Sequence, residues 1–151
     1  MARAYARLAS APRSDDPREA ALATIRRAMQ SRPRAAGGRE RLSTALMEAY
    51  GDRLVSKGGA EGLECVGLTE SRLGIALKSE DGQDRAVAPA VIALLEHLGQ
   101  IRTGEPDSLA AWRSPRVTNR AGLEVGRLRS HGARAGLRVD VTPGVARGLR
   151  R

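Results

Sequence analysis

The feature that most constrains the fold is a cluster of glycines between two apolar runs. Residues 54–62 read Leu-Val-Ser-Lys-Gly-Gly-Ala-Glu-Gly, so three glycines fall within five positions directly after Lys57, and a second apolar run begins at Leu63. Glycine tolerates backbone conformations that other residues avoid, and short apolar runs on either side of it are typical of strands joined by a tight turn. The stretch therefore predicts two antiparallel strands, with Lys57 at the end of the first.

Two interpretations of Lys57 are open at this point. In the first, it is a solvated lysine beside a hairpin turn, which is the common outcome for glycine-rich turns. In the second, its amine takes part in chemistry, because a lysine can steer a carboxylate or, when desolvated, remove a proton from a serine hydroxyl. The glycines that follow would then let a substrate lie close against the strand edge.

The periodicity of apolar residues predicts the other elements. Strands are expected over residues 53–57, 62–68 and 72–78, followed by a strand pair over 117–119 and 123–128. Helices are expected over residues 2–11, 17–32, 39–50, 87–98 and 108–112. Tight turns between neighbouring strands favour antiparallel pairing. The predicted fold class is therefore α+β, with an antiparallel sheet of short strands packed against amphipathic helices.

The helix over residues 17–32 has the clearest start. Asp15 and Asp16 can cap its N-terminus, and Pro17 suits its first position. Its apolar stripe is expected to face the core and its polar stripe to face solvent. The apolar stripe is Ala21, Leu22, Ile25 and Met29, and the polar stripe is Arg18, Arg26, Arg27 and Gln30.

The net charge of +9 is concentrated near the C-terminus. From Arg127 onward there are seven arginines and one acidic residue, so the last 25 residues carry six of the nine net positive charges. Apolar periodicity ends near Ser130, which predicts a domain over residues 1–129 and a basic, flexible tail over residues 130–151. Nucleic-acid binding is disfavoured, because the aromatic residues, two Tyr and one Trp, are scattered and no zinc-finger motif is present.

The cysteine and histidine content excludes several kinds of site. With Cys65 as the single cysteine, the chain can form neither an internal disulfide nor a cysteine metal cluster. Cys65 lies in an apolar run and is expected to be a buried, unreactive thiol. His97 is expected to be solvated near a helix end, and His131 falls in the tail. No apolar run of membrane length and no signal peptide are present, so the expected location is the cytoplasm.

A lysine on a strand has a known use in serine chemistry. In penicillin-binding and β-lactamase enzymes a Lys-Thr-Gly strand faces a nucleophilic serine, which lies on a separate helix in an SxxK motif. This sequence contains no SxxK. Ser56 precedes Lys57 directly, and adjacent side chains on a strand point to opposite faces. The residues therefore supply a lysine without its serine.

These residues resemble the asparaginase II family, the serine-lysine L-asparaginases with a β-lactamase-like architecture. The most specific part is Lys-Gly-Gly-Ala-Glu-Gly, which begins at Lys57. The resemblance covers residues 2–129. Its supporting segments are Ala4-Tyr5-Ala6-Arg7-Leu8, Gly38-Arg39, Thr44-Ala45-Leu46-Met47, Gly51, Gly74-Ile75-Ala76-Leu77-Lys78, Asp81-Gly82, Val117-Thr118-Asn119 and Gly122.

The resemblance implies hydrolysis of L-asparagine to L-aspartate and ammonia. Lys57 matches the family's second catalytic lysine, which pairs with a serine. The residues expected to orient asparagine are Gly58, Gly59 and Ala60. The match is to the C-terminal half of the family's domain, which is expected to form part of the β-lactamase-like fold.

Other parts of the family's site are expected to be missing from this chain. The SxxK-like pair, a second serine and, in some members, a cysteine/lysine zinc site lie in the N-terminal half. No cofactor is therefore expected here, since Cys65 matches no metal ligand and Ser43 stands where some members have cysteine. The chain also begins inside a helical pattern with no capping residue, which suggests that a preceding segment is missing.

Two hypotheses of different classes follow. In the first, the chain is a truncated or split L-asparaginase, inactive alone, which needs an N-terminal half or a homodimer to act on L-asparagine. In the second, it is a non-catalytic remnant or binding module that contacts polyanions through its arginine-rich tail.

Overall fold

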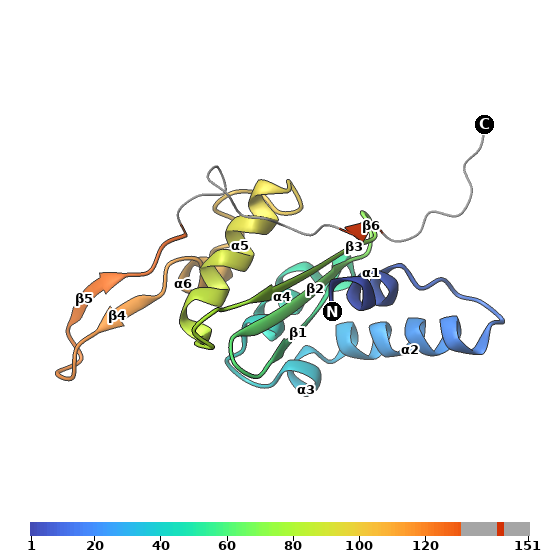
Figure 1. Cartoon of the computed structure of the whole chain (residues 1–151), viewed down its shortest axis with the longest axis horizontal. Coiled ribbons are helices and arrows are strands. Elements are labelled where there is room, and N and C mark those ends of the chain that lie inside the picture. The colour runs from blue at the N-terminus through green and yellow to red at the C-terminus, as the bar shows by residue number, and fades with distance from the viewer. Residues whose placement is uncertain (131–141, 144–151) are drawn as a thin grey trace. The chain divides into compact units, whose positions relative to one another are not determined.

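The computed structural model describes residues 1–130 and 142–143, and it confirms the α+β class (Figure 1). The described chain forms two compact units. The first unit comprises residues 1–58, 65–76 and 142–143, and the second comprises residues 59–64 and 77–130. The predicted basic tail lies almost entirely outside the described residues.

The first unit contains the N-terminal helices and most of a four-stranded sheet. Its helices are α1 (Ala2–Ser10), α2 (Pro17–Ser31), α3 (Pro33–Gly37), α4 (Leu42–Tyr50) and the 3-10 helix η1 (Gly51–Arg53). The strands β1 (Leu54–Gly59), β2 (Leu63–Leu68), β3 (Leu73–Lys78) and β6 (Thr142–Pro143) lie in the order β1-β2-β3-β6, and β6 pairs antiparallel with β3. The predicted helices and strands of this unit are confirmed, with α4 starting three residues later than expected.

The first strand is longer than predicted. β1 runs to Gly59, so Lys57 lies within the strand, and its expected position at the strand end is wrong. The strand continues through Gly58 and Gly59, and Gly59 lies close to Leu63. A Cβ at Gly59 would lie 2.9 Å from Leu63 Cδ2, so only a residue without a side chain fits there without a shift. The turn itself is confined to residues 60–62.

Two further glycines let α1 lie directly against the strands. A Cβ at Gly67, on β2, would lie 2.9 Å from Ala9 Cβ. A Cβ at Gly74, on β3, would overlap the main-chain oxygen of Ala2 and the nitrogen of Ala6. The backbone of α1 therefore packs on the backbone of the sheet, an approach that any side chain at these positions would prevent.

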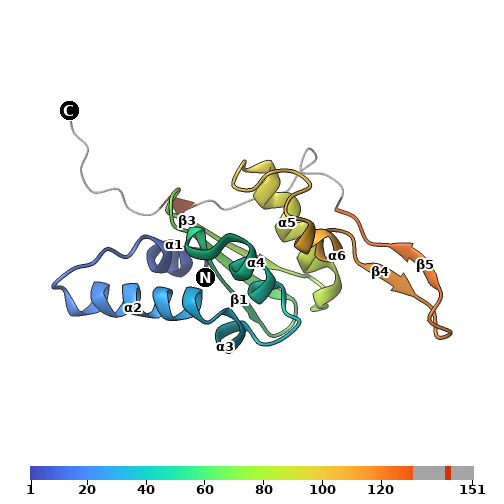
Figure 2. The same ribbon diagram turned by 180° about the vertical axis from the view of Figure 1, so that it is seen from behind.

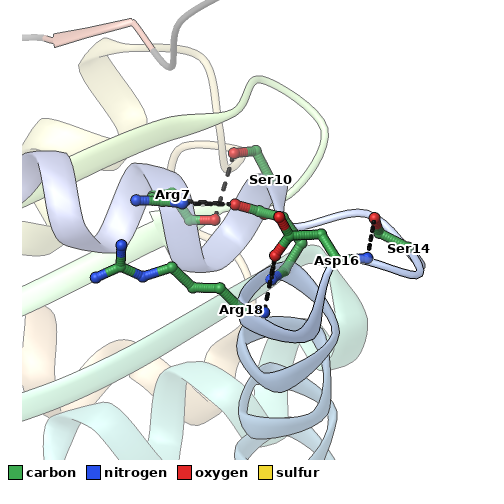
Figure 3. Close-up of polar contacts among 6 residues, drawn as sticks. Arg7, Ser10, Ser14, Asp16 and Arg18 are labelled. Carbon is green, nitrogen blue, oxygen red and sulfur yellow. Dashed lines mark hydrogen bonds and ion pairs between the residues drawn. The ribbon is translucent and has the colours of Figure 1, made fainter.

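Polar contacts fix the connection between α1 and α2 (Figure 3). Asp16 Oδ1 accepts hydrogen bonds from the main-chain nitrogens of Arg18 at 2.8 Å and Glu19 at 3.1 Å, which confirms the predicted helix cap. Ser14 Oγ accepts one from the nitrogen of Asp16 at 3.1 Å. Arg7 Nη2 pairs with Glu19 Oε1 at 2.7 Å, so the first turn of α2 is tied to α1.

The predicted orientation of α2 is right in part: Leu22 and Met29 of the apolar stripe are half-buried, and Arg18 and Arg27 of the polar stripe are exposed. Ala23 is the fully buried residue of this helix, whereas Ile25, from the expected apolar stripe, is 49% exposed. Gln30, which was expected to face solvent, points inward. Its Nε2 donates to the main-chain oxygens of Asp52 at 2.9 Å and Leu54 at 3.1 Å, where β1 begins.

Arg26 is the second residue of α2 that turns inward against expectation. Its Nη1 donates to the main-chain oxygens of Ala9 at 2.6 Å and Ala11 at 3.0 Å. The last carbonyls of a helix have no partner within the helix and carry partial negative charge, so a guanidinium is favoured at the end of α1. These polar contacts therefore share the inward face of α2 with Leu22, Ala23 and Met29.

The core of the first unit comes from α4 and the strands. The short helix α3, which apolar periodicity does not predict, leads into α4 after Pro33 has ended α2. The largest fully buried apolar side chains of this unit are Leu46, Met47, Leu54, Val55 and Val66.

The second unit is built around α5 (Val87–His97), which the 3-10 helix η2 (Asp84–Ala86) precedes. The 3-10 helix η3 (Asp107–Leu109) and α6 (Ala110–Arg113) follow it, so the predicted helices over 87–98 and 108–112 are confirmed. The largest fully buried side chains are Val91, Ile92, Leu95 and Leu109. Glu96 Oε1 accepts from Arg113 Nε at 2.9 Å and from the main-chain nitrogen of Gly104 at 3.2 Å, which fixes the loop after α5.

A two-stranded antiparallel hairpin ends the second unit. It consists of β4 (Arg116–Thr118) and β5 (Glu124–Arg127), which confirms the predicted strand pair. The hairpin extends away from α5 and α6 in both views (Figures 1 and 2). Every residue of the two strands is exposed.

Candidate active site

Lys57, the candidate catalytic residue, lies in the second half of β1 and is half-buried. Its Nζ donates a hydrogen bond to the main-chain oxygen of Gly58 at 3.0 Å. The side chain is therefore folded back along its own strand and does not extend freely into solvent. An amine held in this way is suited to pair with a second group that is brought beside it.

Ser56 has a structural role in the sheet. It is fully buried, and its Oγ donates a hydrogen bond to the main-chain oxygen of Cys65 at 3.1 Å. Because adjacent side chains on a strand point to opposite faces, Ser56 and Lys57 point away from each other, as predicted. Cys65 is itself buried and free of any disulfide, which confirms the expected buried thiol. The strand that carries Lys57 therefore gives it no serine.

The three residues after Lys57 form the strand edge and turn that we expect to contact substrate. Gly58 is half-buried, and both Gly59 and Ala60 are exposed. At Gly59 the space of a missing Cβ is taken by Leu63, whose Cδ2 would lie 2.9 Å away, so another molecule can use that space only by displacing Leu63. The assignment of Gly58, Gly59 and Ala60 as substrate-binding residues stays a prediction.

The turn after these residues has a strained conformation that the sequence analysis missed. Glu61 has φ of 58°, in the left-handed region that residues with a side chain disfavour, and its side chain is 81% exposed. Gly62 follows with φ of 68°, and a Cβ there would lie 2.7 Å from Ser79 Cβ. Lys78 Nζ donates to the main-chain oxygen of Glu61. The sequence offered one signal for this conformation. The chain must reverse within residues 60–62, and only the last of these three residues is glycine.

The predicted turn at Asp81-Gly82 is confirmed, with φ of 72° at Gly82. Asp81 Oδ1 accepts hydrogen bonds from Ser79 Oγ and from the main-chain nitrogen of Gln83, the latter at 3.0 Å, and Oδ2 pairs with Arg85 Nη2 at 2.7 Å. The hydrogen bond from Ser79 is the main cause that lowers the pKa of Asp81, assisted by the bond from Gln83 and the charge of Arg85. This carboxylate organises the turn between β3 and η2.

The segment around Gly38 and Thr44, which carries part of the family resemblance, also has a structural explanation. Thr44 Oγ1 donates to the main-chain oxygen of Gly38 at 2.6 Å, which closes the turn between α3 and α4. A Cβ at Gly37 would overlap Thr44 Oγ1 and lie 2.9 Å from Ser43 Oγ. Ser43 and Thr44 are both buried. Their hydroxyls and the missing side chain of Gly37 allow α3 and α4 to pack closely.

The remaining titratable candidates do not form a second site. His97 is exposed in the last turn of α5, as expected, and His131 lies outside the described residues. Within the part of the chain that the structure describes, no three His, Cys, Asp or Glu side chains are grouped as metal ligands would be. The expectation that this chain holds no cofactor stays a prediction.

Two other expectations can be compared with the described residues. Binding to polyanions depends on the arginine-rich tail, and residues 131–141 and 144–151 lie outside the description, so that hypothesis stays a prediction. Among the described helices, none combines the length and the apolar character that a bilayer-spanning segment requires.

The chemistry available at Lys57 is that of a base or a cation. Proton removal by a lysine amine activates a hydroxyl nucleophile in several classes of hydrolase. A hydrolase also needs that hydroxyl and donors for the developing oxyanion, and backbone N–H groups are the usual donors. The stretch from Lys57 to Ala60 can supply the amine and the backbone donors, and the nucleophile must come from elsewhere.

Comparison with known proteins points to one family. The family model for L-asparaginase II matches residues 1–130, which include Lys57, its strand and the β4–β5 hairpin. A search of the curated proteins finds no match to this chain. Because the family model covers most of the chain, the chain belongs to the L-asparaginase II family of asparaginase-like amidohydrolases.

Proposed function

We propose that this chain contributes to the hydrolysis of L-asparagine to L-aspartate and ammonia, and that it does so with a serine supplied by another polypeptide segment. The observation that carries the proposal is Lys57, half-buried on a Lys-Gly-Gly strand within the range that the family model matches. The family match supports the substrate, and the position of the amine on β1 supports its role. In these terms the chain is a split or truncated form of the family's catalytic domain.

Two observations support a serine from outside this chain. The whole sequence contains no SxxK motif, because the residues three positions before Lys57 and Lys78 are Leu54 and Ile75. Ser56, the serine nearest to Lys57 in sequence, is buried and already donates its hydroxyl to a main-chain oxygen. A serine-bearing segment placed against β1 would complete the pair.

The proposed reaction then follows acyl-transfer chemistry. Lys57 accepts the serine proton while the serine oxygen bonds to the side-chain amide carbon of asparagine. The C–N bond breaks, and its nitrogen takes up the proton that Lys57 accepted and leaves as ammonia, which restores the amine. Water hydrolyses the resulting aspartyl ester, which releases aspartate and restores the serine. Main-chain N–H groups from Gly58 to Ala60 would stabilise the negative charge on the carbonyl oxygen.

The test combines the purified chain with the serine-bearing N-terminal segment of a full-length asparaginase II protein and measures ammonia release from L-asparagine. We expect no turnover from either component alone and turnover from the mixture. Loss of a general base costs about 10²–10⁴-fold, so Lys57→Arg, which keeps the charge, should lower the rate of the mixture at least 100-fold.

The chain provides its own matched control, because Lys57 and Lys78 are its only lysines. Lys78→Arg makes the same substitution at the other position and keeps a donor for the main-chain oxygen of Glu61. This variant should retain turnover near that of the unmodified mixture. Equal rates for Lys57→Arg and the unmodified chain would remove Lys57 from the mechanism, and turnover by the chain alone would contradict the external serine.

A further inference from the structure

Hydrogen bonds within the β4–β5 hairpin hold its turn and its base. Asn119 Oδ1 accepts from the main-chain nitrogens of Ala121 and Leu123, both at 3.0 Å, and the nitrogen of Asn119 donates to the oxygen of Leu123 at 3.0 Å. At the base of the hairpin, the nitrogen of Leu128 donates to the oxygen of Pro115 at 2.9 Å. The turn and both ends of the ribbon are therefore fixed by the hairpin's own contacts.

One face of this hairpin is charged. Arg116 pairs with Arg127 across the strands, and Thr118 pairs with Glu124. Glu124 bridges the two arginines, with 2.7 Å from its Oε1 to Arg127 Nε and 3.4 Å from its Oε2 to Arg116 Nε. These contacts place Arg116, Glu124 and Arg127 on the same face.

The opposite face is apolar, and the described residues leave its side chains exposed. Val117 lies between Arg116 and Thr118 and so points away from the charged face. The register shifts between Val117 and Thr118, where Val125 is the extra residue, so Glu124 and Arg127 share the charged face although they are three residues apart. Leu123 and Val125, on either side of Glu124, point to the opposite face. These side chains are 39%, 64% and 61% exposed for Val117, Leu123 and Val125 respectively, and they are three of the five large apolar residues exposed in the described chain.

A two-stranded ribbon of this kind is marginally stable by itself and needs a third layer. Clustered apolar side chains with a charged surround are typical of protein-binding surfaces. A lipid surface is a poor match, because both strands keep an open edge of N–H and C=O groups that hydrocarbon cannot satisfy. Such edges do suit a protein partner, which can add a strand or donate side-chain hydrogen bonds.

The charges around the apolar face indicate the chemistry of that partner. Arg116 and Arg127 are paired with Glu124 on the charged face, which leaves Arg120 in the turn and Arg129 after the second strand as arginines of the hairpin region outside that bridge. Their positive charge favours a partner with carboxylates around an apolar centre. A second copy of this chain is disfavoured, because it carries the same arginines and a net charge of +9.

We propose that the apolar face of the β4–β5 hairpin docks the serine-bearing polypeptide, through an apolar patch on that polypeptide bordered by acidic residues. The identity of the partner rests on the proposed function, which requires a second polypeptide, whereas the docking surface follows from the hairpin itself. Val117, Leu123 and Val125 provide the apolar contact. Arg120, at the tip, and Arg129, at the base, provide the surrounding charge.

The test measures the dissociation constant for the fluorescently labelled serine-bearing N-terminal segment by anisotropy, separately from ammonia release. The triple variant Val117→Thr/Leu123→Thr/Val125→Thr keeps strand-forming residues while removing apolar surface. It should weaken binding at least 10-fold and should retain turnover once the segment is saturating. Ile25→Thr, which removes another exposed apolar side chain on α2, is the matched control and should leave binding unchanged.

A second variant keeps the proposal testable if the triple variant loses its hairpin. Arg120→Glu/Arg129→Glu leaves the apolar residues and the Glu124 bridge in place, and it should weaken binding several-fold, with the difference shrinking as salt is raised. Unchanged affinity of both variants would overturn the docking surface, as would a failure of the unmodified chain to bind the segment. Binding without ammonia release would instead reject the proposed function and leave the docking surface supported by its affinities.

The unmodified chain and the triple variant also test whether a second copy of the chain or a membrane surface binds the apolar face of the hairpin instead. If sedimentation shows a dimer that the triple variant abolishes while affinity for the segment is unchanged, the occupant is a second copy and the proposal is wrong. If vesicles containing anionic lipid bind the chain and the triple variant does not, while affinity for the segment is unchanged, the occupant is a membrane surface, and the proposal is again wrong.

Discussion

The hydroxyl of Ser56 lies 3.1 Å from the main-chain oxygen of Cys65 and forms a buried hydrogen bond between β1 and β2, one residue before Lys57. We expect Ser56→Ala to lower the free energy of unfolding by about 1 kcal/mol, because a buried hydrogen bond is lost. Urea unfolding followed by circular dichroism measures this change. The variant should keep full turnover with the serine-bearing segment, and a large loss of rate at saturating segment would show that Ser56 has a chemical role.

Apolar periodicity was sufficient to place most of the helices and strands. In β3, for example, Leu73 and Ile75 alternate with small residues, and the strand starts within one residue of its predicted position. The short helix α3 could not be predicted in this way, because five residues are too few to show a period. Pro33 was interpreted only as the end of α2, although proline also suits the first position of a helix.

The inward position of Arg26 on α2 could not be predicted from hydrophobicity. Arg26 reaches carbonyl oxygens fifteen or more positions earlier in the chain, and only the tertiary structure brings the end of α1 within its reach. We expect Arg26→Met to lower the free energy of unfolding by about 2 kcal/mol, because hydrogen bonds from a charged donor to buried carbonyls are worth about 1.5–3 kcal/mol. Thermal and urea unfolding measure the difference.

Arg27 is the control for this prediction. It neighbours Arg26 on α2 but is exposed, and its recorded contact is a long hydrogen bond of 3.5 Å to Thr24 Oγ1. Arg27→Met should change stability by less than about 0.5 kcal/mol, as is usual for surface substitutions. Equal effects of the two substitutions would show that the contacts of Arg26 with the end of α1 contribute nothing specific.

The candidate site was predictable in part. The glycines after Lys57 identified the right strand, and the alternation of side chains correctly separated Lys57 from Ser56. The strain at Glu61 was missed because its left-handed backbone depends on how β1 and β2 pair, which fixes the number of residues left for the turn. The hydrogen bond from Lys57 to Gly58 could not be predicted either, because a flexible side chain has many conformations that sequence cannot distinguish.

Gly74 should be among the least replaceable residues of the first unit. A Cβ there would overlap the backbone of α1 at Ala2 and Ala6, so Gly74→Ala must displace the helix. Overpacking of this kind costs about 1–3 kcal/mol, and a shift of rigid backbone places the expected loss near the upper end. Gly126→Ala is the control, because nothing lies within 4 Å of the added atom. Comparable losses for both variants would contradict the close packing of α1 on β3.

The pH dependence of stability should include a contribution from Asp81. Its pKa is lowered in the folded chain, chiefly by the hydrogen bond from Ser79, so the folded state favours the ionised carboxylate more than the unfolded state does. This contribution is fully present above the unfolded pKa of about 3.9. It is lost as the pH falls through the lower, folded value. NMR titration of the Asp81 carboxyl should give a pKa below the ordinary one, and Ser79→Ala should move it back upward. Between pH 5 and pH 2, the free energy of unfolding should fall less for Asp81→Asn than for the unmodified chain. The same dependence of that free energy on pH in both proteins would show that the hydrogen bond does not form in solution.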